Sequence, residues 1–201
     1  MKIVIHRVNL SSELKKIPRE FGVEIDVRGY GNQMLLNHDP LNPNLKYESL
    51  EDYLKSYHHS LAVFNMKEAG YEQRVIDLAK EYGIEDYFLL DVEFPYIYRA
   101  TRKEGFRKIA SRYSEAEPIE MTLAQKGLLD WVWIDTNTQI PLNPEVVSKL
   151  SGFKTCLVCP SRWGREQDIG PYADKIKQLK MNLDAVMTSI ENADKWLKEL
   201  S

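Results

Sequence analysis

Short apolar runs alternate with amphipathic stretches along the whole chain, and this alternation constrains the fold more than any other feature. Most of the runs are rich in β-branched or aromatic residues, which is typical of strands that are buried on both faces. They cover residues 2–7, 22–28, 60–67, 87–94, 107–114, 131–137, 155–161 and 183–189. The pattern predicts parallel strands, each followed by a helix.

The stretches between the runs carry helix signals. Ser49 stands three residues before Asp52, an acidic variant of the capping box, and the stretch that begins at Glu68 stops at Gly83. The serines at the start of the first stretch predict an N-cap there as well. The predicted helices lie within 11–21, 49–57, 68–83, 95–105, 118–128, 143–152, 172–180 and 190–200.

Eight strands alternating with eight helices predict an α/β fold of the compact (β/α)8 TIM-barrel type, formed by one domain over residues 1–201. A chain of about 200 residues is at the short end for this fold. An open doubly wound sheet is the alternative, but no G-x-G-x-x-G fingerprint follows the first run.

Charge and hydropathy exclude several classes of partner. The formal net charge is -3, so no basic field favours nucleic acid, and no apolar run is long enough to span a membrane. The first ten residues, MKIVIHRVNL, turn polar too early for a signal peptide, which makes a cytoplasmic location the expectation, although export through a partner stays open. The sequence leaves the oligomeric state undetermined.

The only two cysteines, Cys156 and Cys159, have the C-x-x-C spacing of redox and zinc sites. Zinc would need a second pair of ligands. On a strand, moreover, residues three apart face opposite sides. We therefore expect two reduced, buried thiols.

Polar residues collect at the carboxyl ends of the apolar runs, where a barrel would bring them to one mouth. Glu24 and Asp26 are unusual among them, because both stand inside the apolar run GVEIDV and share one face of the strand. Buried carboxylates need compensation. A divalent cation would supply it, and so would a neighbouring Arg or Lys; the spacing alone leaves both open.

Two of the four histidines, His6 and His38, each follow an apolar run directly. The glycines in VRGYGNQMLLN predict a hairpin-like excursion that would bring His38 back toward Glu24 and Asp26. Two imidazoles beside a carboxylate pair favour a site over two separate structural histidines.

The motifs HR after the first run, EIDVR in the second and LLNHD a dozen residues later resemble the glycerophosphodiester phosphodiesterase family, a barrel family related to phosphatidylinositol-specific phospholipase C. VFNMKE resembles the segment in which that family has Glu-x-Lys. The last run and helix, LDAVMTSIENADKWL, match in order and spacing only.

The resemblance implies a metal-dependent phosphodiester hydrolase that acts on a small or lipid-derived phosphodiester. By the resemblance, His6 and His38 are the acid–base pair and Arg7 and Lys67 contact the phosphate. Glu24 and Asp26 bind Mg²⁺ or Ca²⁺, with Asn65 at the position of the third metal ligand. The nucleophile in such barrels is often a hydroxyl of the substrate itself.

The sequence departs from the family at three places. Val8 replaces the glycine of the HRG motif, and the Glu-Asn-Thr that usually follows is absent. Asn65 replaces an acidic ligand, which weakens a metal site unless Asp91 compensates. The insertion that helps select glycerol-type substrates is missing after His38, which leaves the substrate open.

Further polar residues would lie at the same mouth. Arg112 is predicted to bind substrate, and Asp135, Arg162 and Trp163 are additional candidates; Arg165 would add cationic character. The alternative for each cation is an ion pair with an acidic neighbour. Those neighbours are Glu115, Glu117, Glu166 and Asp168.

Two other functions stay open. One is a catalytically weak or inactive barrel that binds a phosphorylated sugar, a lipid or a protein partner. The other is a lyase or aldolase in which Lys67 forms a Schiff base.

Overall fold

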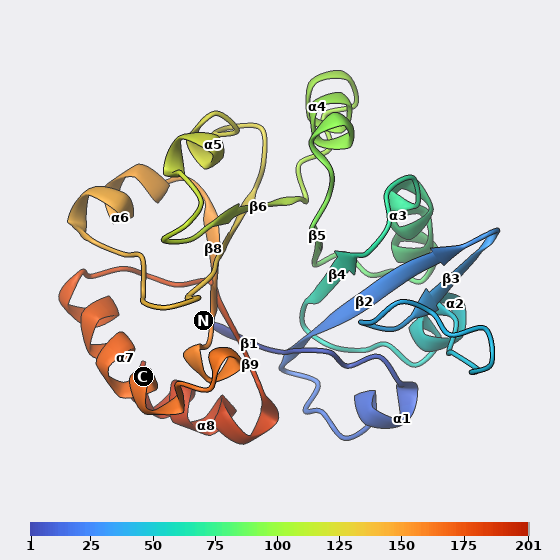
Figure 1. Ribbon diagram of the computed structural model, residues 1–201, viewed down its shortest axis with the longest axis horizontal. Helices are drawn as coiled ribbons and strands as arrows, with labels where there is room; N and C mark the ends of the chain where they lie inside the picture. Colours follow the sequence, from blue (N-terminus) through green and yellow to red (C-terminus); the bar gives the residue numbers. More distant parts are fainter. Residues whose placement is uncertain (201) are drawn as a thin grey trace.

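Eight parallel strands form a nearly closed barrel in the computed structural model, which describes residues 1–200 (Figure 1). The strands are β1 (Lys2–Ile5), β2 (Gly22–Tyr30), β4 (Ala62–Met66), β5 (Tyr87–Leu90), β6 (Ala110–Tyr113), β7 (Trp131–Ile134), β8 (Lys154–Val158) and β9 (Ala185–Thr188). Their order is β5-β4-β2-β1-β9-β8-β7-β6, and a single bridge between Leu89 and Ile109 joins the two end strands. The predicted TIM barrel and all eight predicted strands are confirmed.

A helix lies within or across each predicted amphipathic stretch. The helices are α1 (Ser11–Leu14), α2 (Leu50–Leu54), α3 (Glu72–Glu81), α4 (Phe94–Lys103), α5 (Ile119–Leu123), α6 (Pro144–Leu150), α7 (Ile169–Gln178) and α8 (Ile190–Glu199). Two short 3₁₀ segments, η1 (Pro160–Trp163) and η2 (Glu166–Asp168), follow β8. Within residues 1–200 the structure contains no helix with the length and apolar character that crossing a membrane requires.

The helix starts only partly follow the sequence signals. Ser49 caps α2 as predicted, because its Oγ accepts from the Asp52 N–H at 3.1 Å. The predicted serine cap of α1 is wrong: Leu10 is the N-cap residue and its side chain makes no capping bond, while the Ser11 N–H donates to Glu48 Oε2 at 2.8 Å. α1 is also shorter than its stretch, which contains Pro18, and proline disfavours helical backbone in the residue before it.

A hairpin extends β2 beyond the barrel. Strand β3 (Gln33–Leu36) pairs antiparallel with Val27–Tyr30 of β2, and Gly31 makes the turn with φ +56°. A Cβ at Gly29 would overlap the ring of Tyr71, so a larger residue there would force that ring to move. The predicted excursion is thus confirmed, and it returns His38 to the mouth of the barrel.

Side chains alternate between two apolar cores, one inside the barrel and one between the barrel and its helices. On β2, Val23, Ile25 and Val27 pack outward, so Glu24 and Asp26 point into the barrel. The interior core includes Phe88 stacked on Trp131, with ring centroids 4.5 Å apart.

The two cysteines are buried and unpaired by disulfide, as expected. Cys156 belongs to the interior core and Cys159 to the outer core, where the Trp196 Nε1–H donates to its sulfur at 3.2 Å. They therefore face opposite sides of the barrel wall.

Candidate functional site

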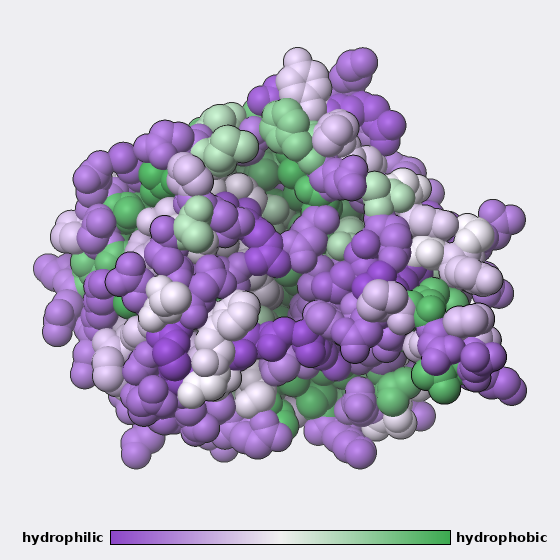
Figure 2. All heavy atoms as spheres, viewed as in Figure 1, coloured by the Kyte–Doolittle hydropathy of each residue, from purple (hydrophilic) through white to green (hydrophobic). Residues whose placement is uncertain are grey.

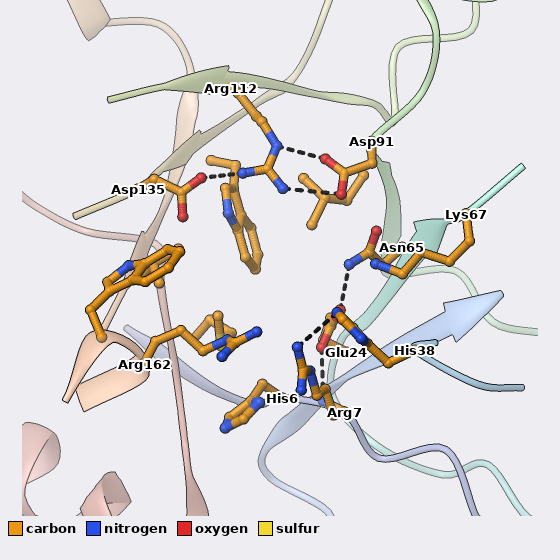
Figure 3. Close-up of a pocket in the computed structure, with 15 residues that line it drawn as sticks. His6, Arg7, Glu24, His38, Asn65, Lys67, Asp91, Arg112, Asp135 and Arg162 are labelled. Atoms are coloured by element: carbon orange, nitrogen blue, oxygen red, sulfur yellow. Dashed lines mark hydrogen bonds and ion pairs between the residues drawn. The ribbon is translucent and has the colours of Figure 1, made fainter. Parts of the chain in front are cut away.

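A cavity of about 230 Å³ opens at the carboxyl ends of the strands and is lined by both halves of the barrel (Figure 3). Its polar lining residues are His6, Arg7, Glu24, His38, Asn65, Lys67, Asp91, Arg112, Asp135 and Arg162. Leu90, Trp133, Val158, Trp163 and Met187 complete the wall. Every residue predicted for the site is in this lining except Asp26 and Arg165.

Strand alternation explains why these residues meet. An interior apolar residue near the middle of a strand is followed two positions later by a polar one at its carboxyl end. Val4 is followed by His6, Ala110 by Arg112 and Trp133 by Asp135. The interior of the barrel is therefore apolar in its middle and polar at one mouth.

Glu24 is a buried carboxylate at the centre of the first half of the site. Its Oε2 accepts from the Arg7 backbone N–H at 2.7 Å, and its Oε1 accepts from Asn65 Nδ2 at 2.7 Å. Arg7 has φ +55°, a left-handed conformation that is costly for a non-glycine residue and typical of functional sites. Burial, with a smaller contribution from Asp26, raises the pKa of Glu24. The carboxylate therefore lacks a full counter-charge.

Asp26 is fully buried and lies outside the cavity lining. Its Oδ1 pairs with Lys67 Nζ at 3.0 Å, and its Oδ2 accepts from Asn9 Nδ2 at 2.8 Å. The Asp26 N–H in turn donates to Asn9 Oδ1 at 2.8 Å. These contacts and its position outside the lining make Asp26 less accessible to a metal ion than Glu24 is. The sequence left open whether a divalent cation or a basic side chain compensates Asp26. In the structure Lys67 compensates it.

The oxygen atoms that face the cavity allow a limited metal site. Among residues 1–200, no three His, Cys, Asp or Glu side chains are grouped so that they could hold a metal ion. Asn65 Oδ1, however, is buried without a hydrogen-bond partner next to the under-compensated Glu24. A carboxylate and an amide oxygen suit a hard cation such as Mg²⁺, which often takes one or two protein carboxylates and keeps water or phosphate as its other ligands. The residues thus fit a divalent cation, with fewer charges than the resemblance implies.

His38 is held on both sides. Its Nε2 lies 2.7 Å from Arg7 Nη2, and its Nδ1 lies 2.9 Å from Asp39 Oδ1. Because arginine can only donate, Nε2 accepts and the imidazole proton is on Nδ1, where it donates to Asp39. The Arg28 guanidinium also donates to the His38 carbonyl at 2.8 Å. The ring is therefore oriented before any ligand arrives.

His6 differs from His38 because the structure gives its ring no fixed partner. Its Nδ1 is buried and makes no hydrogen bond. Burial, followed by the nearby Arg162 and Arg7, lowers the pKa of His6 from the ordinary 6.5. His6 is consequently a neutral imidazole at pH 7 and is able to accept a proton.

Arg112 crosses the second half of the mouth between two carboxylates. Its Nε and Nη2 donate to the two oxygens of Asp91 at 2.6 and 3.0 Å, and its Nη1 donates to Asp135 (Figure 3). Asp91 also has a left-handed backbone, with φ +59°. Arg112 is therefore engaged in ion pairs, which was the alternative that the sequence raised. Its partners are Asp91 and Asp135 and not the acidic neighbours that were expected. Its predicted role in binding substrate stays a prediction.

Arg162 and Arg165 stand in contrasting surroundings. Within residues 1–200, the Arg162 guanidinium makes no ion pair or hydrogen bond; it lies 5.8 Å from the ring of Trp163 and extends into the cavity (Figure 3). Arg165 instead pairs with Asp168 and Tyr172 outside the cavity, both at 2.7 Å. Arg162 is thus a cation in the cavity that is not already engaged by an acidic group.

Sequence reasoning missed two supporting residues. Asn9 holds Asp26, and Asp39 fixes the tautomer of His38. Asp39 directly follows His38 in the sequence, so adjacency was a usable signal. No local pattern marks Asn9, because its partner lies 17 residues further on.

No protein-family model matches the chain, and no curated protein matches it. Solved structures do match it over nearly its whole length. A putative glycerophosphoryl diester phosphodiesterase from Agrobacterium tumefaciens str. C58 (Dupont) aligns with a TM-score of 0.68 at 10% identity, covering 99% of this chain and 98% of that one. A phosphodiesterase from Oleispira antarctica, solved with the product sn-glycerol-3-phosphate, aligns with 0.67 at 14% identity, covering 100% and 96%.

A glycerophosphoryl diester phosphodiesterase from Parabacteroides distasonis ATCC 8503 aligns with a TM-score of 0.64 at 11% identity, covering 99% of this chain and 86% of that one. At these identities the likeness concerns the fold. It agrees with the resemblance carried by the HR, EIDVR and LLNHD motifs of the first forty residues. The chain has the barrel fold of the glycerophosphoryl diester phosphodiesterases.

Proposed function

We propose that the protein is a phosphodiester hydrolase that uses His6 and His38 as its acid–base pair. The observation that carries this proposal is that both imidazoles line one cavity together with the cations Arg7, Lys67 and Arg162. The cations attract a phosphodiester, and histidines titrate near neutral pH, which suits proton transfer. The fold shared with glycerophosphoryl diester phosphodiesterases supports the same reaction class.

The two histidines take different roles because their surroundings differ. His6 is neutral and accepts the proton of the attacking hydroxyl, which belongs to the substrate or to water. The new O–P bond forms as the bond from phosphorus to the alcohol oxygen breaks. His38 takes up a proton from solvent at Nε2 and gives it to the departing alkoxide, while Asp39 keeps the Nδ1–H oriented.

Arg7 couples phosphate binding to His38. In the present structure the Arg7 guanidinium occupies His38 Nε2. When the guanidinium turns to a phosphoryl oxygen, Nε2 is released and can carry the proton for the leaving group. Arg162 and Lys67 approach from other strands and stabilise charge on the remaining phosphoryl oxygens.

We further propose dependence on a divalent cation, Mg²⁺ or Ca²⁺, held by Glu24 and Asn65. Such an ion would neutralise Glu24 and add positive charge beside the phosphoryl oxygens. Asp26 is not among these ligands in the proposal, because it lies outside the cavity lining and is already compensated by Lys67. The substrate in this proposal is a small or lipid-derived phosphodiester.

The test is hydrolysis of a generic chromogenic phosphodiester by purified protein supplied in turn with Mg²⁺, Ca²⁺ and Mn²⁺. We expect turnover that chelation reduces. Absence of cleavage with every one of these metals would rule out the hydrolase.

A second candidate is a barrel that binds a phosphorylated ligand without turnover. The ion pair between Lys67 and Asp26 favours it, because it occupies a carboxylate that the resemblance assigns to the metal. This candidate predicts stabilisation by phosphate esters that survives His38→Ala, with no product formed. The same ion pair disfavours a Schiff-base lyase, because Lys67 would have to leave Asp26 before its nitrogen could attack a carbonyl group.

A further inference from the structure

A second cavity of about 490 Å³ adjoins the polar cavity at the seam between β5 and β6. Most of its lining is apolar. Phe94 and Ile97 come from the start of α4, Met121 from α5, and Leu129 from the segment before β7. Figure 2 shows apolar side chains gathered in a hollow at this place, between α4 and α5 in the view of Figure 1. We call this cavity the seam groove.

The seam groove exists because the barrel is weakly joined there. Leu89 and Ile109 form the single bridge between the two strands. The residues of β6 beside it, Ala110 and Ser111, are small and line the groove. Protein interiors normally fill such space with side chains.

Large apolar side chains are left exposed at the groove. The exposed fractions of Phe94 and Met121 are 53% and 62%. Contiguous exposed apolar surface of this kind typically marks a binding site. The groove also falls within the size range of about 300–1,000 Å³ that holds drug-sized ligands.

The groove and the polar cavity share two residues, Asp91 and Arg112. The two cavities are therefore neighbours on either side of the ion pair of Arg112 with Asp91, and a molecule whose phosphodiester lies among His6, Arg7 and Arg162 would pass over that pair to reach the groove. An apolar extension would be stabilised there, because most of the exposed lining of the groove is apolar, whereas an anionic extension would meet Glu93 and Glu117.

We propose that the substrate is an amphiphilic phosphodiester with a single aliphatic chain, and that the chain occupies the seam groove. The proposal deepens the proposed function and rests on it, since it takes the polar cavity to bind a phosphodiester. Because the two cavities adjoin at Asp91 and Arg112, the groove lies within reach of a chain attached to a phosphodiester in the polar cavity, which is why we take its occupant to be part of the substrate.

The first experiment measures binding of inorganic phosphate and of monoalkyl phosphates of increasing chain length to the wild-type protein by calorimetry. Below the micellar concentration, each added methylene should lower the dissociation constant about two- to fourfold, as burial of apolar surface predicts. Equal affinities for all chain lengths would overturn the inference and leave the hydrolase proposal intact.

The second experiment repeats the series with Met121→Glu and with Phe94→Ser. Both side chains are more than half exposed, so folding should be unaffected. We expect the dependence on chain length to disappear while the affinity for inorganic phosphate stays within about twofold. Leu197→Glu is the matched control, because Leu197 is an exposed apolar residue on α8, away from the groove; it should retain the dependence.

Two further outcomes separate the possibilities. Chain-length dependence that is lost in Met121→Glu, in a protein that cleaves no diester, would sustain the groove and remove the hydrolase. A wild-type dimer that Met121→Glu converts to a monomer in light scattering would show that the groove is an interface between copies, and would overturn the inference.

Discussion

The two halves of the barrel mouth differ in how completely the polar atoms beside the cavity are paired. In the first half, from β1, β2 and β4, polar atoms remain without partners next to the cavity: His6 Nδ1 and Asn65 Oδ1 are buried and make no hydrogen bond. In the second half, from β5, β6 and β7, Asp91, Arg112 and Asp135 bind one another. Arg162, which follows β8, also lines the cavity, but its guanidinium makes no ion pair within residues 1–200.

The difference shows that position in the cavity does not by itself make a residue reactive. Arg112 and Arg162 both reach the cavity, but the guanidinium of Arg112 is already satisfied by two carboxylates. A guanidinium without an anionic partner binds an incoming phosphate at lower cost, because no existing ion pair must break. We therefore expect chemistry from the first half and stability from the second.

The largest expected effect concerns the first half. His6→Ala or His38→Ala should lower kcat/KM by about 10²–10⁴-fold, because each variant removes a proton-transfer group. Asp135→Asn, in the second half, should change kcat/KM by about tenfold at most. Steady-state kinetics on a phosphodiester measures this, with thermal unfolding to show that both histidine variants fold. Equal losses of kcat/KM in the histidine variants and in Asp135→Asn would contradict the assignment of the chemistry to the first half.

Lys67→Met should destabilise the fold by about 3–5 kcal/mol, because it leaves the fully buried carboxylate of Asp26 without its cation. Denaturant unfolding measures the loss. The double variant Lys67→Met/Asp26→Leu is the control and should recover more than half of the lost stability, since no uncompensated charge remains. A single variant as stable as the wild type would contradict the ion pair.

Arg112→Gln should mainly lower stability and Arg162→Gln should mainly weaken phosphate binding, although both variants remove one positive charge from the cavity. Arg112→Gln leaves Asp91 and Asp135 facing each other and should cost about 1–3 kcal/mol of unfolding free energy. Arg162→Gln should change stability by less than about 0.5 kcal/mol and weaken phosphate binding about tenfold. Denaturant unfolding of both variants measures the stability change, and calorimetry measures the change in phosphate affinity. The idea fails if Arg162→Gln unfolds the protein more readily than Arg112→Gln does.

The smallest expected effect is on pH dependence. The pKa of His6 is lowered in the folded protein, so the neutral ring is the form that the fold favours. The contribution of His6 to stability is therefore present above about pH 6.5, the ordinary histidine pKa, and is lost as pH falls through the lower pKa of the folded protein. As the base, His6 should also set an acid limb of kcat/KM below pH 6.5.

Arg162→Gln should move this acid limb to higher pH, because Arg162 is one of the charges that lower the pKa of His6. Arg99→Gln provides the control, since it removes the same charge from an exposed residue on α4 outside the cavity. An acid limb at the same pH in Arg162→Gln as in the wild type would show that Arg162 does not influence the pKa of His6.

The sequence was most informative where one local rule decided the outcome. Alternation of apolar runs and helices predicted the barrel, because each strand needs both of its faces covered. The shared face of Glu24 and Asp26 and the turn at Gly31 followed from strand periodicity and backbone freedom, and the structure confirms both. Proximity of His6, His38, Glu24 and Lys67 at one mouth followed from the barrel itself.

The sequence could not predict in the same way which charged groups form ion pairs with one another. Glu24 and Asp26 are equivalent in the sequence pattern, yet one faces the cavity and the other binds Lys67 and Asn9. Likewise, nothing near Arg112 in the chain indicates that residues 21 positions before it and 23 positions after it will pair with it.

The sequence by itself determined the order of the elements, the faces of the strands and the set of charged groups at the mouth, because these depend on near neighbours in the chain. Only the tertiary structure decided which charges neutralise one another, which remain free and where the seam groove opens. Ion pairing and packing depend on distances between strands far apart in the sequence, and those distances are fixed only when the barrel closes.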